Sequence, residues 1–357
     1  MAVSAKIYDR VLCLDGGGIR GLIILEILEA IEKEADKPII DLFDWIGGTS
    51  TGGIIALGIA TGKSVSEIRD QYNRLKDQVF KGSRPYDSEL IETLMKKEFG
   101  ETKVMTDIKE PKVLVTSVLG DHYPWKLHMF RSYKEDTEPE EDPRFEPIKP
   151  PNETYIWEVA RSTSAAPTYF HPYKQFYDGG IMSNNPTLDI LEEIHKYYTR
   201  RKTGSSRSLG MVVSIGCGYV EYAKQEIPDP YTPGWMNLIF HPLKSKKALE
   251  DMLRFLKGIL EQVVISSGQP SHRARAWCQM QNVSFSRFSP LLAENVPLDC
   301  VAERVIDKMI QDTRYYINTP EHFKRIHEVA IASKAGRHVK LVFRPEPIYN
   351  VHDAIEY

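Results

Sequence analysis

Asp41-Leu-Phe-Asp-Trp-Ile-Gly-Gly-Thr-Ser-Thr-Gly-Gly53 is the stretch that decides the fold of this 357-residue chain. An apolar segment, residues 43–46, runs into Gly48-Thr-Ser-Thr-Gly52, and small apolar residues follow at 54–60. Glycines two positions before and after Ser50 remove the side chains that would clash where a strand turns sharply into a helix. The pattern predicts a Ser50 hydroxyl at a helix N-terminus, which favours developing negative charge. The alternative is a glycine-rich turn with an incidental serine.

A second glycine turn lies earlier in the chain. Residues 10–14 are typical of a buried strand and lead into Asp15-Gly-Gly-Gly-Ile-Arg-Gly21. The spacing G-x-G-x-x-G between a strand and a helix fits a dinucleotide-binding loop, with Asp36 and Asp41 near the position of a ribose-binding carboxylate. This interpretation describes a dinucleotide-binding oxidoreductase.

The other interpretation of this turn is an oxyanion hole, formed by the N–H groups of Gly16, Gly17 and Gly18. One such donor stabilises a tetrahedral intermediate by about 3–4 kcal/mol. Acyl transfer requires both a nucleophile and these donors, whereas dinucleotide binding gives no reason for the glycine-flanked Ser50. The sequence therefore favours the oxyanion hole.

Asp178-Gly-Gly180 ends a short apolar segment and precedes Asn184-Asn-Pro186. Because the apolar segment is typical of a short strand, Asp178 is expected at a strand end. A helix is expected to follow, since Asn suits a helix N-cap and Pro suits the first helical position. The two glycines leave space beside the Asp178 carboxylate, which can then approach Ser50 and accept its proton. The alternative is that Asp178 only organises a turn, because Asp-Gly is a common turn dipeptide.

Strands and helices alternate through much of the remaining chain. This alternation predicts an α/β sandwich around a mainly parallel sheet. From residue 243 onward the chain is expected to be mostly helical, with Val301, Val305 and Met309 on one late helix. The other expected helices are 22–34, 64–79, 154–165 and 186–197, and the expected strands are 112–118, 127–133, 175–177 and 209–215.

Composition and charge exclude several classes of protein. A net charge of -3 disfavours nucleic-acid binding, because phosphate neutralisation needs a basic surplus. The four cysteines lack C-x-x-C and zinc-ligand spacing, and no EF-hand or H-E-x-x-H pattern occurs, so no metal and no cofactor is expected. The sequence has no signal-peptide core and no run long enough to span a bilayer. We expect a cytoplasmic protein with peripheral membrane association.

Four blocks, taken in order, resemble those of the patatin-like phospholipases. They are Asp15-Gly-Gly-Gly-Ile-Arg-Gly21, Gly48-Thr-Ser-Thr-Gly52, Ala160-Arg-Ser-Thr-Ser-Ala-Ala-Pro-Thr-Tyr-Phe170 and Asp178-Gly-Gly-Ile-Met-Ser-Asn-Asn-Pro186. The flanking segments resemble the catalytic domain of the animal calcium-independent (group VI, beta type) phospholipases A2. Those segments are Val11-Leu-Cys-Leu14, Asp41-Leu-Phe-Asp-Trp45, Gly82-Ser-Arg-Pro-Tyr86 and Arg273-Ala-Arg-Ala-Trp-Cys278. The similarity runs from about residue 8 to beyond residue 330.

The resemblance implies a patatin-like three-layer sandwich with a mainly parallel central sheet and a helical C-terminal extension. The whole chain, 1–357, is then one catalytic domain, with its core at about 8–200 and its helical C-terminal part at about 243–335. Animal members usually carry an ankyrin array upstream. This sequence contains no ankyrin repeats, so its regulation stays open.

The resemblance also implies a reaction, the calcium-independent hydrolysis of fatty acyl esters of glycerophospholipids at a membrane surface. Ser50 would be the nucleophile and Asp178 the base of a Ser–Asp dyad that works through an acyl-serine. The same dyad suits a lysophospholipase, an acyl-CoA thioesterase or a transacylase, and a non-catalytic lipid-binding module is a further class. The supporting motif residues are Gly48, Gly52, Arg20, Gly179 and Gly180.

Two roles near the dyad stay open. Arg20 is either a contact for a phosphate or other anion, or an ordinary surface arginine that opens a helix. A histidine is not excluded as a third member of the dyad. His171, the nearest in sequence to Asp178, precedes Pro172 in a segment expected to be an apolar strand and is expected to be structural.

An apolar loop bracketed by prolines, residues 231–243, is a candidate for membrane contact. Aromatic side chains beside lysines are typical of an interfacial insertion patch. The alternative is that they pack under the following helix. The resemblance further suggests a homodimer and regulation by calmodulin near Trp277, neither of which follows from the residues themselves. The membrane-contact candidates are Trp235, Leu238, Ile239, Phe240, Lys244, Lys246 and Lys247.

Overall fold

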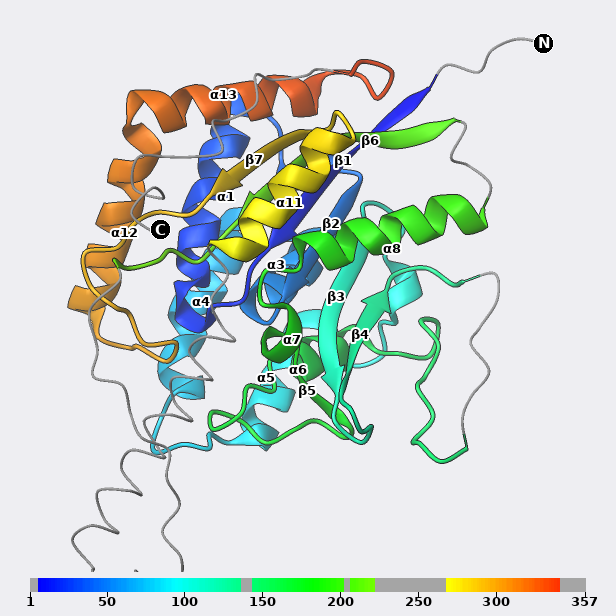
Figure 1. The fold of residues 1–357 in the computed structure, drawn as a ribbon. Helices are drawn as coiled ribbons and strands as arrows, with labels where there is room; N and C mark the ends of the chain where they lie inside the picture. The colour runs from blue at the N-terminus through cyan, green and yellow to red at the C-terminus, as the bar shows by residue number, and fades with distance from the viewer. Residues whose placement is uncertain (1–5, 136–142, 202–205, 222–267, 341–357) are drawn as a thin grey trace, which may run out of the picture.

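The computed structural model describes residues 6–135, 143–201, 206–221 and 268–340 (Figure 1). Within these residues seven strands form one sheet in the order β4-β3-β2-β1-β6-β7, with β5 also paired to β3. The parallel strands are β1 (Ile7–Leu14), β2 (Trp45–Thr49), β3 (Lys112–Leu119), β6 (Arg207–Ile215) and β7 (Ser284–Phe288). Two strands run antiparallel to β3, namely β4 (Lys126–Arg131) and β5 (Phe176–Asp178). The predicted mainly parallel sheet is confirmed.

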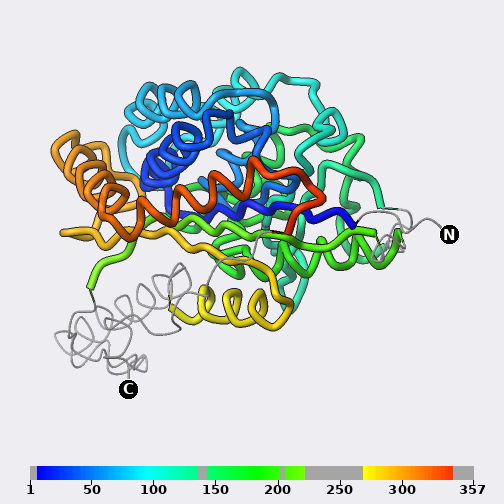
Figure 2. The backbone as a smooth tube through the Cα atoms, turned by 90° about the horizontal axis from the view of Figure 1, so that it is seen from above, coloured from blue at the N-terminus to red at the C-terminus, as the bar shows by residue number. Residues whose placement is uncertain are grey.

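Helices cover both faces of the sheet (Figure 2). Leu12 and Leu14 of β1 pack into the core on the side of α1, α12 and α13, while Val11 and Cys13 pack on the side of α8 and α11. Burial on both faces explains why the strand is continuously apolar. The helices are α1 (Gly21–Ala35), α2 (Ile39–Leu42), α3 (Thr51–Ala60), α4 (Val65–Val79), α5 (Ser88–Phe99), α6 (Ile156–Thr163), α7 (Gly180–Ser183), α8 (Thr187–Arg200), α11 (Gln269–Met280), α12 (Glu303–Asn318) and α13 (Pro320–Lys334), with short 3-10 turns η1 (Gly18–Arg20) and η2 (Met105–Asp107).

The described C-terminal part is mostly helical, as predicted, with α11, α12 and α13. It also contains a strand that was not predicted, because β7 pairs with β6 and extends the sheet. The strand was missed because Ser284, Ser286 and Arg287 are polar yet buried, so the segment carries no apolar run. The late helix α12 begins at Glu303, two positions after Val301.

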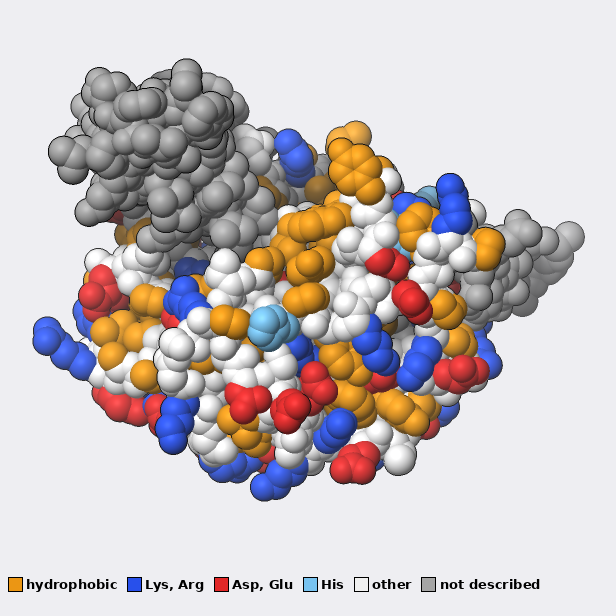
Figure 3. All heavy atoms as spheres, turned by 90° about the horizontal axis from the view of Figure 1, so that it is seen from below, with side chains coloured by type: hydrophobic (Ala, Val, Ile, Leu, Met, Phe, Trp, Pro, Cys, Tyr) orange, Lys and Arg blue, Asp and Glu red, His pale blue; other side chains and the backbone are white. Residues whose placement is uncertain are grey.

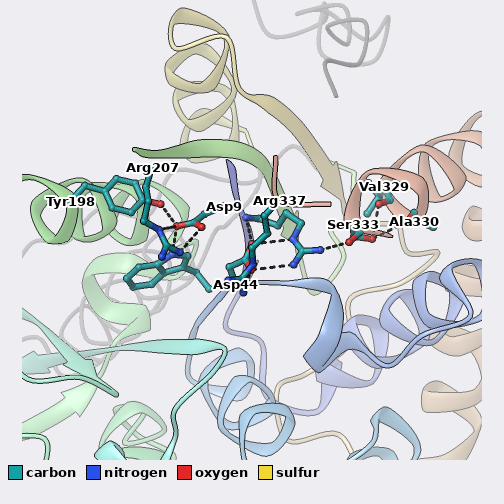
Figure 4. Close-up of polar contacts among 10 residues, drawn as sticks. Asp9, Asp44, Tyr198, Arg207, Val329, Ala330, Ser333 and Arg337 are labelled. Carbon is teal, nitrogen blue, oxygen red and sulfur yellow. Dashed lines mark hydrogen bonds and ion pairs between the residues drawn. The ribbon is translucent and has the colours of Figure 1, made fainter. Parts of the chain in front are cut away.

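Two buried aspartates form hydrogen bonds and ion pairs at the end of the sheet where the parallel strands begin (Figure 4). Asp44 accepts hydrogen bonds from Arg10 and pairs with Arg337, which follows α13, and Arg10 also donates to the carbonyl of Ser333. This network ties the last helix to β1 and β2. The partners of the other aspartate, Asp9, are Trp45, Tyr198 and Arg207. Ser50 and Asp178 lie at the opposite end of the sheet, where the parallel strands finish.

Candidate active site

Ser50 lies at the sharp turn between β2 and α3. Its φ of 53° falls in the region that favours glycine, so the residue is held in a strained conformation. The flanking glycines are needed for steric reasons. A Cβ on Gly48 would lie 2.3 Å from the Gly52 carbonyl oxygen, and a Cβ on Gly52 would lie 2.4 Å from that of Leu14. The predicted strand–turn–helix around Ser50 is present.

The backbone of Ser50 is held by a side chain from α6. Its N–H donates to Thr163 Oγ1 at 2.8 Å, and Thr163 is fully buried. Thr163 belongs to the block 160–170 that carries the family resemblance, and its sequence context did not predict this role. A hydroxyl acceptor contributed by a distant helix carries no local signal in the sequence.

Ser50 and Asp178 are in direct contact. Ser50 Oγ donates a hydrogen bond to Asp178 Oδ2 at 2.7 Å. The register of the sheet produces this contact, because Thr49 at the end of β2 pairs with Thr116, and Asp178 at the end of β5 pairs with the next residue of β3, Ser117. Ser50 and Asp178 therefore meet where β2 leaves β3 and β5 takes its place.

The Asp178 carboxylate is buried, with 4% of its surface exposed, and burial raises its pKa from 3.8 to about 6. Hydrogen bonds from the Gly180 N–H (2.7 Å) and from Ser50 oppose this rise. Gly179 is required beside it, since a Cβ there would lie 2.2 Å from Thr116 Oγ1. The carboxylate is thus a stronger base than an ordinary aspartate and is still largely ionised at neutral pH.

Within the described part of the chain, the Asp178 carboxylate bonds to Ser50 and Gly180 and to no histidine. His171 lies in an exposed loop before β5, and its backbone carbonyl accepts a hydrogen bond from Arg161. The expectation that His171 belongs to an apolar strand is wrong. The segment 171–175 is too polar and too exposed to join the sheet, which β5 enters only at Phe176.

The first glycine turn lies against the same site. A Cβ on Gly16 would lie 3.3 Å from Ser50 Cβ, but the Gly16 N–H already donates to the Asn184 carbonyl at 3.0 Å. Among the described residues the N–H groups of Gly17 and Gly18 have no acceptor. Of the three predicted oxyanion donors, Gly16 is therefore already engaged, and Gly17 and Gly18 remain the candidates.

The turn is held from both sides by residues whose roles were not predicted from the sequence. Ile19 donates its N–H to the Leu298 carbonyl at 2.8 Å, and Gly18 has a φ of 57°. Asp15, directly before the turn, forms a buried ion pair with Arg287 of β7, with an N–O distance of 2.5 Å. The C-terminal part of the chain thus helps to shape the glycine turn.

Arg20 is half-buried next to this turn, and its Nε lies 3.5 Å from the Gly17 carbonyl oxygen. Burial lowers its pKa below the usual value for arginine. Across the described residues its guanidinium has no carboxylate partner. This environment is unlike that of an ordinary surface arginine.

The predicted membrane-contact residues and Trp277 are not part of this site as the structure describes it. The membrane-contact candidates Trp235, Leu238, Ile239, Phe240, Lys244, Lys246 and Lys247 lie outside the described residues. Trp277 lies half-buried on α11, whose neighbours Ala274 and Cys278 are buried. No helix in the described segments is long and apolar enough to cross a membrane.

The known proteins that are similar to this chain in sequence include several phospholipases A2. The chain is 40% identical over 343 residues to the 85/88 kDa calcium-independent phospholipase A2 of Rattus norvegicus, an alignment that covers 93% of this chain and 42% of the relative. It is 34% identical to the intracellular phospholipase A2 of Caenorhabditis elegans, over 87% of this chain and 28% of that protein. The calcium-independent phospholipase A2-gamma of Mus musculus is 24% identical, over 91% of this chain and 40% of its own length. The chain thus spans less than half the length of each of these relatives.

The crystal structure of VipD from Legionella pneumophila aligns with 92% of this chain and 68% of its own, but its TM-score of 0.37 and 10% identity are too low to support an argument. The family model described as patatin-like phospholipase matches residues 12–191, which is half of the chain and contains the glycine turn, Ser50 and Asp178. The resemblance and the expected fold class are confirmed, and the chain belongs to the patatin-like phospholipase family.

Proposed function

We propose that this chain hydrolyses fatty acyl esters of glycerophospholipids, without calcium, through a Ser50–Asp178 dyad and an acyl-serine intermediate. The observation that carries the proposal is the 2.7 Å hydrogen bond between a strained serine hydroxyl and a buried carboxylate of raised pKa. The printed names of the relatives, calcium-independent phospholipase A2 among them, support the choice of substrate class and of a reaction without calcium.

In the first half-reaction, Asp178 Oδ2 takes the proton from Ser50 Oγ while Oγ forms a bond to the ester carbonyl carbon. The carbonyl oxygen becomes an oxyanion, which the N–H groups of Gly17 and Gly18 stabilise. When the tetrahedral intermediate collapses, the bond to the glycerol oxygen breaks and that oxygen receives the proton from Asp178. The products are an acyl-Ser50 and a lysophospholipid.

In the second half-reaction, a water molecule replaces the alcohol. Asp178 takes one proton from the water as its oxygen attacks the acyl carbon, and it returns that proton to Ser50 Oγ when the acyl bond breaks. A free fatty acid leaves and the dyad is restored. Two groups, one base and one nucleophile, are sufficient for both half-reactions.

Arg20 is assigned to the anionic part of the substrate. It is a cation beside the glycine turn, and in the described part of the chain no carboxylate neutralises it. A guanidinium suits a phosphate because its donors match the phosphate oxygens in geometry. This assignment, and peripheral association with a phospholipid membrane, belong to the same proposal.

The experiment is hydrolysis of phosphatidylcholine vesicles in the presence of EDTA, measured as released fatty acid. We expect Ser50→Ala and Asp178→Ala each to lower turnover by roughly 10³-fold or more while the protein stays folded. Ser66→Ala and Asp70→Ala, at exposed positions on α4, are the matched controls. Turnover by Ser50→Ala at the parent rate would overturn the proposal.

Two further measurements separate the other classes of function. A fluorophosphonate should label Ser50 covalently, because only an activated serine reacts. Absence of labelling would favour a non-catalytic lipid-binding module. Titration with NADH should leave the intrinsic fluorescence unchanged, and tight binding would favour a dinucleotide-binding protein.

A further inference from the structure

The hairpin that connects β3 and β4 presents aromatic side chains to solvent at the end of the sheet that carries the dyad. Its tip, residues 120–125, extends from the edge of the sheet where β3 pairs with Asp178 (Figure 1). Tyr123 is 98% exposed and Trp125 is 44% exposed. A tyrosine with nearly all of its surface in water gains nothing from packing within its own chain.

The tip is attached to the strand that carries Asp178. The Gly120 N–H donates to the Gln175 carbonyl at 2.8 Å, and the Trp125 ring stacks on Tyr177 with centroids 5.2 Å apart. Tyr177 directly precedes Asp178. The position of Trp125 relative to the dyad is therefore fixed by β5.

Other apolar and charged side chains share this edge. Met182 on α7 is 50% exposed and lies four positions after Asp178. Figure 3, which views the molecule from this side, shows hydrophobic side chains gathered among scattered cationic and anionic ones. Phe145 stacks on His122 of the tip, with ring centroids 3.6 Å apart, and so brings its neighbours Arg144 and Glu146 to the tip. The exposed charges there are of both signs, Lys126 and Arg144 against Asp121 and Glu146.

We propose that the hairpin tip, residues 120–125, inserts the side chains of Tyr123 and Trp125 into the interface of a zwitterionic phospholipid bilayer. The inference rests on the proposed function, because it supplies the route by which an ester in a bilayer reaches Ser50. Tyr and Trp have an apolar body and a polar end, and they are the residues enriched at the boundary between lipid and water. Headgroups that carry one positive and one negative charge complement the mixed charges around the tip, whereas a strongly anionic surface does not.

The test uses the Ser50→Ala protein, so that binding is measured without hydrolysis. Sedimentation with phosphatidylcholine vesicles should show that Tyr123→Ser lowers the partition coefficient about tenfold, because the ring loses its burial in the interface. Tyr123→Trp should restore binding. Tyr315→Ser, at a 79% exposed tyrosine on α12, is the matched control and should bind like the parent.

A second measurement addresses Trp125 directly. Brominated phosphatidylcholine quenches tryptophans that enter the interface, and Trp125→Phe should reduce the quenched fraction of the fluorescence. Thermal unfolding of each variant verifies that the fold is retained. If Tyr123→Ser binds vesicles as the parent does, or if Trp125→Phe leaves quenching unchanged, the proposal is overturned.

Two outcomes distinguish this proposal from related ones. If Tyr123→Ser weakens self-association in sedimentation velocity while vesicle binding is unchanged, the tip contacts a second copy of the chain and the lipid proposal is wrong. If the tip variants lose vesicle binding but the Ser50-intact protein releases no fatty acid, the surface is confirmed and the proposed hydrolysis fails instead.

Discussion

The side chain of Thr163 holds the backbone of Ser50. Thr163 Oγ1 accepts the Ser50 N–H at 2.8 Å from a position on α6 that is 0% exposed. A non-glycine residue at positive φ is costly, by about 1–3 kcal/mol, and persists only where its surroundings determine it. At Ser50 these surroundings are the close backbone contacts of Gly48 and Gly52 and the hydrogen bond to Thr163. Thr163 is therefore a positioning residue, which acts on the substrate only through Ser50.

Replacing Thr163 with valine keeps the shape of the side chain but removes the acceptor. We expect Thr163→Val to lower kcat roughly 10- to 100-fold, which corresponds to about 1–3 kcal/mol for a buried N–H left without a partner. KM should change little, and labelling by a fluorophosphonate should slow in parallel with kcat. Thr163→Ser retains the acceptor and should recover most of the rate. Equal kcat for the valine and serine variants would contradict the assignment.

The pH profile of hydrolysis should report the ionisation of Asp178. Only the ionised carboxylate can accept the Ser50 proton, and burial raises its pKa to about 6. We expect kcat/KM to rise about tenfold per pH unit below about pH 6 and to level off above it. The measurement requires a soluble short-chain ester, so that vesicle binding does not enter the profile. A break near the ordinary value of 3.8 would show that burial does not raise the pKa of Asp178, and a rate that does not fall at low pH would show that Asp178 is not the base.

The same shift makes Asp178 a cost to stability at neutral pH. Because its pKa is higher in the folded than in the unfolded chain, the folded state holds more protons between about pH 4 and 6, and stability falls as pH rises through that window. Asp178→Asn removes the buried charge. We expect it to stabilise the fold by about 1–3 kcal/mol near pH 7 and by almost nothing below about pH 4. Urea unfolding at the two pH values tests this, with Asp70→Asn as the control at an exposed position.

The features predicted from sequence are those that neighbouring residues dictate. Gly48 and Gly52 predicted the turn at Ser50 because their missing side chains are a local steric requirement, and the structure places Leu14 and Gly52 backbone where a Cβ would stand. The fold class followed from the alternation of apolar strands and amphipathic helices. The nearness of Ser50 to Asp178 is a property of sheet register, and only the combination of motifs indicated it.

The features that sequence reasoning missed depend on contacts between distant segments. Three hydrogen bonds of the site join residues that are far apart in the chain. The Gly16 N–H donates to Asn184, the Ser50 N–H donates to Thr163, and the glycine turn donates to Leu298. The strand β7 was missed for a related reason. Its residue Arg287 is polar, and its burial depends on partners that are distant in sequence, Asp15 and Ser214.

The ion pair between Asp15 and Arg287 should be essential for the stability of the glycine turn. Asp15 is 0% and Arg287 is 8% exposed, so Arg287→Met would leave a buried carboxylate without its main counter-charge. Removing one member of a buried pair typically costs about 3–5 kcal/mol, whereas an exposed pair contributes about 1 kcal/mol or less. Lys196→Met, which breaks the pair between a 45% exposed lysine and the 63% exposed Glu192, is the matched control.

We expect urea unfolding to show the large loss for Arg287→Met and the small loss for Lys196→Met. Adding Asp15→Asn to Arg287→Met should recover part of the stability, because the uncompensated charge is then gone. Hydrolysis should stay low in this double variant, since Gly17 and Gly18 lie only two and three positions after the altered residue. Full recovery of hydrolysis together with stability would mean that the pair serves the fold alone and has no part in shaping the turn.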